Sequence, residues 1–100
     1  MPFVPTTAIE CIIRALPETH FLRLEAIARS VAPARGEYSF FVVKRSPTGS
    51  SNNAQSGAFV LQAGQQQVLA TLVLDRSAVG NYRAELSLQS NDKRFTCTSP

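Results

Sequence analysis

The chain has 100 residues, of which 44% are hydrophobic, and it carries a formal net charge of +3. This length is typical of one domain with a thin core, and we expect a single domain over residues 1–100. Its apolar runs are far shorter than the roughly 20 residues that span a membrane, so we expect no membrane insertion. The start, Met1 to Pro5, lacks the basic and apolar regions of a signal peptide. An exported protein would therefore correspond to the mature chain.

Short runs of alternating apolar and polar residues recur along the chain, separated by proline, glycine and asparagine. This alternation is typical of strands with one buried face. It predicts seven strands, at residues 8–16, 20–31, 37–45, 58–62, 65–75, 81–89 and 93–98. Seven strands with regular turns favour an all-β, immunoglobulin-like Greek-key β-sandwich. We expect residues 1–7 to be a flexible N-terminus and the polar segment 46–57 to be a mobile loop.

The run 20–31 is the least decisive of these segments. Phe21, Leu24 and Ala28 form a stripe at helical spacing. Read with a period of two, alternate residues from Leu22 to Ala28 line one face instead. We predict a strand, because every other segment is a strand and a lone helix would need its own packing surface.

Two cysteines, Cys11 and Cys97, lie near opposite ends of the chain. No CxxC motif or neighbouring histidine accompanies them, so zinc binding and thioredoxin-like chemistry are unsupported. They are either two reduced, buried thiols or a disulfide between the first and last strands. We favour the disulfide, because both cysteines fall on apolar faces of terminal strands. Such a bond implies a periplasmic or secreted protein.

Patterns for catalysis, metals and cofactors are missing from the sequence. His20 is its one histidine, so a catalytic triad or a histidine metal site would lack partners. The seven carboxylates are scattered, and no glycine-rich phosphate loop is present. We therefore expect a binding protein and not an enzyme, with no metal and no cofactor.

We expect the binding surface to be one outer face of the sandwich. The ten basic residues are spread out, without the dense basic and aromatic stripe of nucleic-acid-binding domains, so we expect no nucleic-acid partner. If Tyr38, Phe40 and Val42 point into the core, their neighbours point outward. In an immunoglobulin-like sandwich the third, sixth and seventh strands are adjacent. The face they form mixes apolar and basic groups, and its candidate binding residues are Phe41, Val43, Arg45, Arg83 and Arg94.

A set of spaced residues occurs in a fixed order along the chain. The set runs Cys11, Gly36-x-Tyr38-x-Phe40-x-Val42-x-Lys44, Ser51-Asn52-x-x-Gln55-x-Gly57-x-Phe59-x-Leu61-x-Ala63-Gly64-Gln65, Tyr82-x-Ala84-x-Leu86 and Cys97. From about Ala8 to Cys97, this set resembles the CsgH branch of the CsgC-like curli-assembly chaperones. The CsgC branch carries a CxC pair that is missing here, so no thiol-exchange role is carried over from it.

The resemblance implies a periplasmic immunoglobulin-like chaperone of curli biogenesis, a process of biofilm formation. Its partner would be the amyloidogenic curli subunit, which it would keep from forming amyloid through transient, charge-guided contacts. We expect it to act as a monomer. The alternative is a structural or adhesive immunoglobulin-like module that binds a surface protein or carbohydrate. A third possibility is a redox protein that uses Cys11 and Cys97.

Overall fold

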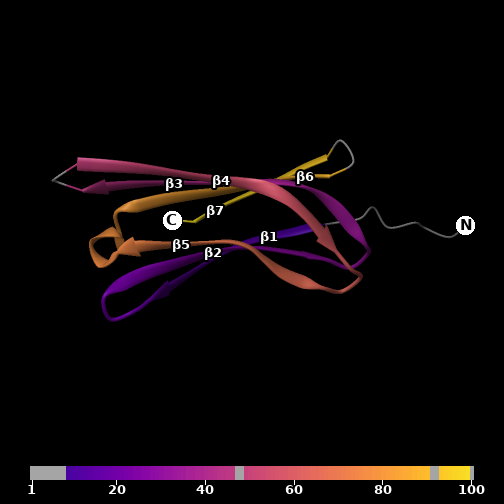
Figure 1. The fold of residues 1–100 in the computed structure, drawn as a ribbon, viewed down its shortest axis with the longest axis horizontal. Coiled ribbons are helices and arrows are strands. Elements are labelled where there is room, and N and C mark those ends of the chain that lie inside the picture. Colours follow the sequence, from indigo (N-terminus) through magenta and orange to yellow (C-terminus); the bar gives the residue numbers. More distant parts are fainter. Residues whose placement is uncertain (1–8, 47–48, 91–92, 100) are drawn as a thin grey trace, which may run out of the picture.

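Two antiparallel sheets face each other in a computed structural model that describes residues 9–46, 49–90 and 93–99 (Figure 1). The strands are β1 Ile9–Pro17, β2 Phe21–Ser30, β3 Ala34–Ser46, β4 Gly49–Leu61, β5 Gln66–Asp75, β6 Tyr82–Ser90 and β7 Lys93–Ser99. One sheet has the order β1-β2-β5 and the other the order β4-β3-β6-β7. The predicted all-β, seven-stranded sandwich is confirmed. The N-terminus expected to be flexible, 1–7, lies outside the described residues.

Helical structure is limited, among the described residues, to one turn of 3₁₀-helix at Arg76–Ala78 between β5 and β6. No helix in this part of the chain is long and apolar enough to span a membrane. The ambiguous run 20–31 is strand β2, which pairs with β1 on one side and β5 on the other. Leu22, Leu24 and Ala26 point into the core and are at most 2% exposed. The strand prediction is confirmed because a central strand satisfies its backbone groups on both sides.

The core lies between the two sheets. Alternate residues of the strands point into it, except at the exposed ends of the edge strands. Its largest fully buried side chains include Leu22 and Leu24 from one sheet and Phe40, Leu86 and Leu88 from the other. Burial of such side chains contributes about 1.5–3 kcal/mol each relative to full exposure. The outward residues of the same strands are left for solvent or for partners.

Strand β4 is the main departure from the sequence prediction. In the segment expected to be a loop, 46–57, Ser46 is the last residue of β3 and residues 49–57 belong to β4, while residues 47–48 lie outside the described residues. The two strands pair without a register shift from Ala34 opposite Leu61 to Ser46 opposite Gly49. Serine, asparagine and glycine have weak strand preferences, but a long β-prone partner strand overrides them. β3 also begins at Ala34, three residues before the start of the predicted strand 37–45.

This long hairpin also fixes the sheet to which the fourth strand belongs. In a constant-type immunoglobulin sandwich the fourth strand pairs with the fifth, whereas here β4 pairs with β3. The predicted adjacency of β3, β6 and β7 is confirmed. Strands β4 and β5 are consequently edge strands of different sheets, on the same side of the sandwich (Figure 1).

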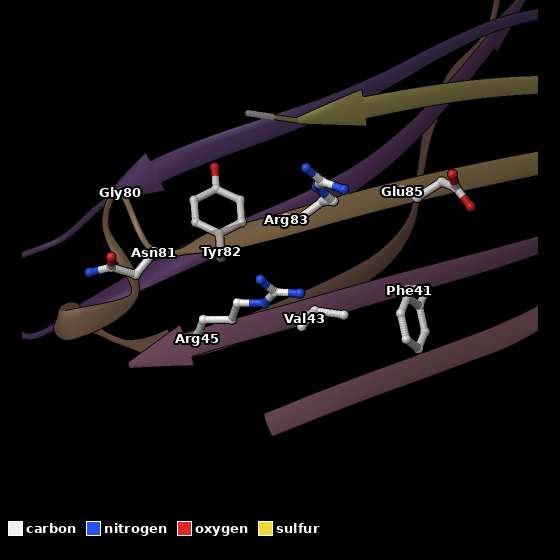
Figure 2. A pocket seen from close by; sticks show the side chains of 8 residues that line it. All are labelled: Phe41, Val43, Arg45, Gly80, Asn81, Tyr82, Arg83 and Glu85. Atoms are coloured by element: carbon white, nitrogen blue, oxygen red, sulfur yellow. The ribbon is translucent and has the colours of Figure 1, made fainter. Parts of the chain in front are cut away.

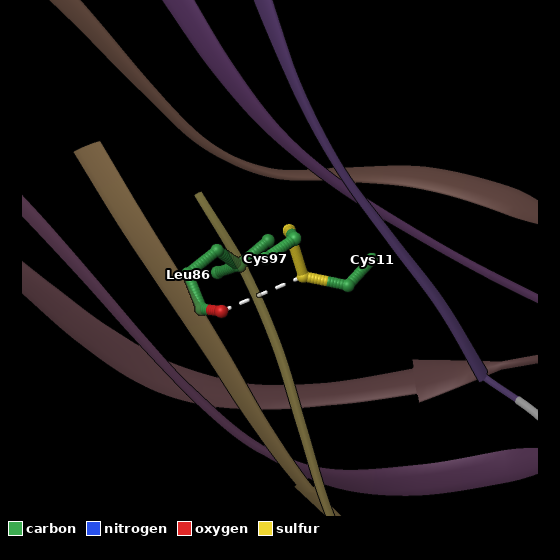
Figure 3. The surroundings of a disulfide bond; sticks show 3 residues. All are labelled: Cys11, Leu86 and Cys97. Atoms are coloured by element: carbon green, nitrogen blue, oxygen red, sulfur yellow. Dashed lines mark hydrogen bonds between the residues drawn. A yellow bond between two sulfur atoms is a disulfide. The ribbon is translucent and has the colours of Figure 1, made fainter. Parts of the chain in front are cut away.

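The opposite side is closed by a disulfide between Cys11 of β1 and Cys97 of β7, with a Cα–Cα distance of 5.8 Å. The predicted pairing is confirmed, and neither cysteine is free. Cys11 Sγ also lies 3.5 Å from the Leu86 carbonyl oxygen (Figure 3). A disulfide sulfur carries no proton, so this is a packing contact and not a hydrogen bond. The bond joins the two sheets across 86 residues of sequence.

Loss of the disulfide should lower the free energy of unfolding by roughly 4 kcal/mol or less, because the cross-link restricts a long loop of the unfolded chain. The variant Cys11→Ala/Cys97→Ala should keep its β-sheet circular dichroism and unfold at lower urea concentration. Reduced wild-type protein serves as the control and should unfold like the variant. An unchanged urea midpoint in both would contradict a stabilising role.

Gly36 of β3 lies close against the backbone of β6. A Cβ atom at this position would lie 2.0 Å from the Gln89 carbonyl oxygen and 3.2 Å from Cζ of Phe59. Neither neighbour can yield without moving a strand or a buried ring. A side chain at residue 36 would therefore push β3 away from β6.

The variant Gly36→Ala should accordingly lose about 1–3 kcal/mol of unfolding free energy, the usual effect of overpacking. Ser39→Ala is the matched control, because Ser39 lies in the same strand with its side chain exposed. Urea denaturation of both variants measures the difference. Equal stability of the two would show that β3 and β6 can separate at Gly36 without cost.

Candidate functional site

The outer face of the β1-β2-β5 sheet is electrically neutralised by ion pairs. Each of its three arginines contacts a glutamate, and the pairs are Arg14–Glu25 at 3.4 Å, Arg23–Glu18 at 4.0 Å and Arg29–Glu10. Exposed pairs of this kind contribute only about 0–1 kcal/mol each to stability. Their main consequence is electrostatic, because the net charge of +3 is left for the rest of the molecule.

The apolar surface of this same face is covered at its centre and open at the β5 edge, where Val68 and Val73 are 44% and 55% exposed. Ile27 points away from the core but is 0% exposed, with Ile12 and Val68 as its register partners. The rows on either side hold the pairs Arg29–Glu10 and Arg14–Glu25, and a register shift at Ala26/Ile27 alters the local course of the strands. The apolar contact surface that Ile12 and Ile27 would offer is thus largely closed.

The outer face of the β4-β3-β6-β7 sheet is hollowed by an open groove of about 670 Å³ (Figure 2). The β3–β6 register creates it by placing Phe41 opposite Glu85 and Val43 opposite Arg83. Its lining residues are Phe41, Val43, Arg45, Gly80, Asn81, Tyr82, Arg83 and Glu85. Four of the five predicted binding residues therefore lie together, namely Phe41, Val43, Arg45 and Arg83.

The groove combines free positive charge with apolar surface. Arg45 and Arg83 are exposed, and neither has an ion-pair partner among the described residues. Figure 2 shows them on neighbouring strands with both side chains over the same face. Phe41 is 42% exposed beside them, and Glu85 is the groove's acidic residue. An extended chain with carboxylates next to apolar side chains would find complementary groups here.

One end of the groove is formed by the turn that leads into β6, which sequence reasoning did not identify as a lining element. Its backbone follows the 3₁₀ turn, and Gly80 takes a φ of 79°, a conformation that favours glycine. Asn81 accepts a hydrogen bond from the Arg45 backbone N–H at 2.8 Å, and its side chain donates to the Ser77 carbonyl at 3.1 Å. These bonds fix the end of β3, and hence Arg45, against the turn.

Tyr82 is a further lining residue of the groove, which the alternation of β6 did not predict. Its alternation places it with the inward residues, and the structure finds it half-buried against the core. Its hydroxyl shares a hydrogen bond with Ser99 Oγ of β7 at 3.1 Å. The residue is the first of β6 and is one of those that line the groove.

Arg94, the fifth predicted binding residue, lies on the same outer face but outside the groove. It pairs with Gln89, which is six residues beyond Arg83 along β6. At about 3.3 Å per residue, this separates the two arginines by roughly 20 Å. A single short segment of a partner would contact the groove or Arg94, and only a longer one would reach both.

Groups for metal chemistry do not gather in the described part of the chain, where no three of its His, Cys, Asp and Glu residues are placed to hold an ion. What the groove offers is recognition of a partner through charge and apolar contact.

Comparison with known proteins identifies relatives of this fold. The solution structure of R. palustris CsgH superposes with a TM-score of 0.77 and 27% sequence identity, covering 91% of this chain and 90% of that one. The E. coli curli protein CsgC has the same TM-score at 12% identity, covering 95% and 99%. No curated protein matches the chain significantly. The sequence model described as CsgH protein matches residues 10–99, so this chain belongs to the CsgH family.

Proposed function

We propose that the protein is a chaperone that inhibits premature amyloid formation by the secreted curli subunit. Membership of the CsgH family supports a role in curli assembly, as does the shared fold with a protein described as a curli protein. The disulfide supports a periplasmic location, because such bonds persist in oxidising compartments. We propose that it acts as a monomer, by binding and not by catalysis.

The observation that carries this proposal is the unequal distribution of free charge between the two faces. Arginines on the β1-β2-β5 sheet are held in ion pairs, whereas Arg45 and Arg83 are not. These two flank exposed Phe41 and the half-buried Val43 in one groove. An acidic, unfolded client would be drawn to this face and not to the other.

Such contacts are suited to transient binding. Electrostatic attraction raises the rate of encounter more than the strength of the complex. A few exposed charge-assisted and apolar contacts hold a client segment only briefly, so the client is released for export. Brief binding is sufficient to delay amyloid formation if it interrupts the rare early assembly of clients.

We predict that Arg45→Glu/Arg83→Glu will greatly weaken the inhibition of curli-subunit fibril formation. About ten times as much variant should be needed for the same delay in fibril onset, because steering changes encounter rates by tenfold or more. Dye fluorescence measures the onset at substoichiometric amounts of the protein. Raised salt should shorten the wild-type delay by screening the same attraction.

The matched control is Arg35→Glu/Arg94→Glu, which changes net charge equally at the far end of the same sheet. It should retain most of the inhibition. Equal losses in both double variants would assign the effect to overall charge and not to the groove. The absence of any delay with the wild-type protein would refute the chaperone function itself.

A further inference from the structure

Charge is missing from one continuous stretch of the chain. Between Arg45 and Asp75 there is no lysine, arginine, aspartate, glutamate or histidine. In the fold this stretch supplies β4 and nearly all of β5, the two edge strands on the side of the sandwich away from the disulfide. The other two edge strands, β1 and β7, carry charged residues, among them Glu10 and Arg94. One side is thus charged and cross-linked, and the other is uncharged and not cross-linked.

An edge strand presents unpaired backbone groups on which a further strand can form, and proteins usually block this with charges, prolines or bulges. β5 has such protection. Its pairing with β2 shifts register at Ala26/Ile27, and a bulge of this kind bends an edge. The Thr71 carbonyl of β5 also accepts a hydrogen bond from Gln55 Nε2 of β4 at 3.3 Å.

β4 lacks these protections, apart from the same single bond between Gln55 and β5. Its sequence, GSSNNAQSGAFVL, contains no charge and no proline, and its register with β3 is unbroken throughout. The side chains of Ser50, Asn52, Ala54 and Ser56 are exposed on the outer face. The first half of β4 is therefore a long, regular and open edge, bordered by the groove. Arg45 is the register partner of Ser50, so the two features are one strand apart.

We propose that the free edge of β4 over residues 50–56 adds a strand from the amyloid-forming client, and that the added segment is uncharged and rich in asparagine, glutamine and serine. This inference rests on the proposed function and names where the client's strand pairs. Backbone hydrogen bonds to an edge need no particular sequence. The exposed amide of Asn52 selects amide-rich segments, because stacked amides form ladders in cross-β structure.

A charged client residue at this edge would lose water without meeting an opposite charge. A second copy of the protein is disfavoured as occupant, because pairing two β4 edges would bring two basic faces into one sheet. An acidic client is instead attracted by Arg45 and Arg83 and then meets the edge. A client strand seated on β4 has one of its own edges covered, and that edge is no longer open to another client.

Amide signals of the ¹⁵N-labelled protein test this directly when freshly desalted, monomeric curli subunit is added during the lag before fibrils form. Signals of residues 50–56 should shift or broaden, whereas those of Thr96 on the opposite edge should not. The variant Ser56→Lys should reduce the perturbation about tenfold at equal client concentration, since the lysine would be desolvated by an added strand.

Thr96→Lys is the matched control. Ser56 and Thr96 are exposed in the same cross-strand row, through Ser39 and Ser87, at the two edges of one sheet. Both variants gain the same charge, and the control should respond to client like the wild type. Equal responses of the two variants would overturn the proposal.

Fibril onset recorded in the same samples separates this inference from the proposed function. Unperturbed β4 signals would overturn strand addition, and a delay in onset would then leave the chaperone function standing. Perturbed β4 signals without a delay would support strand addition and refute inhibition. Perturbation that grows with the protein's own concentration, without client, would assign the edge to a second copy and overturn the proposal.

Discussion

A covalent bond between Cys11 and Cys97 holds the two sheets together along the β1 and β7 edges. A domain of this size buries too little surface for a large free energy of unfolding. A cross-link between its first and last strands adds stability because it closes a long loop and so restricts the unfolded chain. The bond also sets an asymmetry. The disulfide holds the sheets together on one side of the sandwich. On the other side, the β4 and β5 edges are held together by packing and by a few hydrogen bonds, such as that from Gln55 to Thr71.

Electrostatics follow the same division of the molecule. Three ion pairs neutralise the outer face of the β1-β2-β5 sheet while contributing little to stability. Free positive charge is left on the other sheet, where Arg45 and Arg83 stand beside Phe41. A partner approaching from solution therefore meets one electrically neutral face and one basic face, although the net charge of the chain is small.

Side-chain alternation was sufficient to predict much of this arrangement. It placed Leu22 and Leu24 on one face of a strand, Phe41 and Val43 outside the core, and both cysteines on the apolar faces of terminal strands. It failed for β4, because Ser51 to Gly57 have weak strand preferences and become a strand only through pairing with β3. The composition of a segment does not show that the strand before it is long enough to pair with it along its whole length.

The sequence predicted which outer face carries the candidate site, but not which residues of that face lie together. Alternation assigns a residue to one side of a sheet, but the register between strands decides which residues meet. Arg83 lies opposite Val43, whereas Arg94 lies beside Gln89 at the other end of the face. Tyr82 was missed as a lining residue because it alternates with the inward residues, although it is the first residue of β6 and lines the groove.

In the proposed function, the basic groove and the uncharged edge would perform different steps and would need each other. Charge acts over about 8–10 Å at physiological salt, so Arg45 and Arg83 gather acidic clients but distinguish poorly among them. Strand addition at β4 acts only on contact and requires an extended, uncharged segment, which is the conformation that nucleates amyloid. Hydrogen bonds formed at such an exposed edge contribute little net free energy, because water competes for the same groups. Under this proposal a client segment would be bound in the extended conformation that nucleates amyloid, covered on one edge, and released without any input of energy.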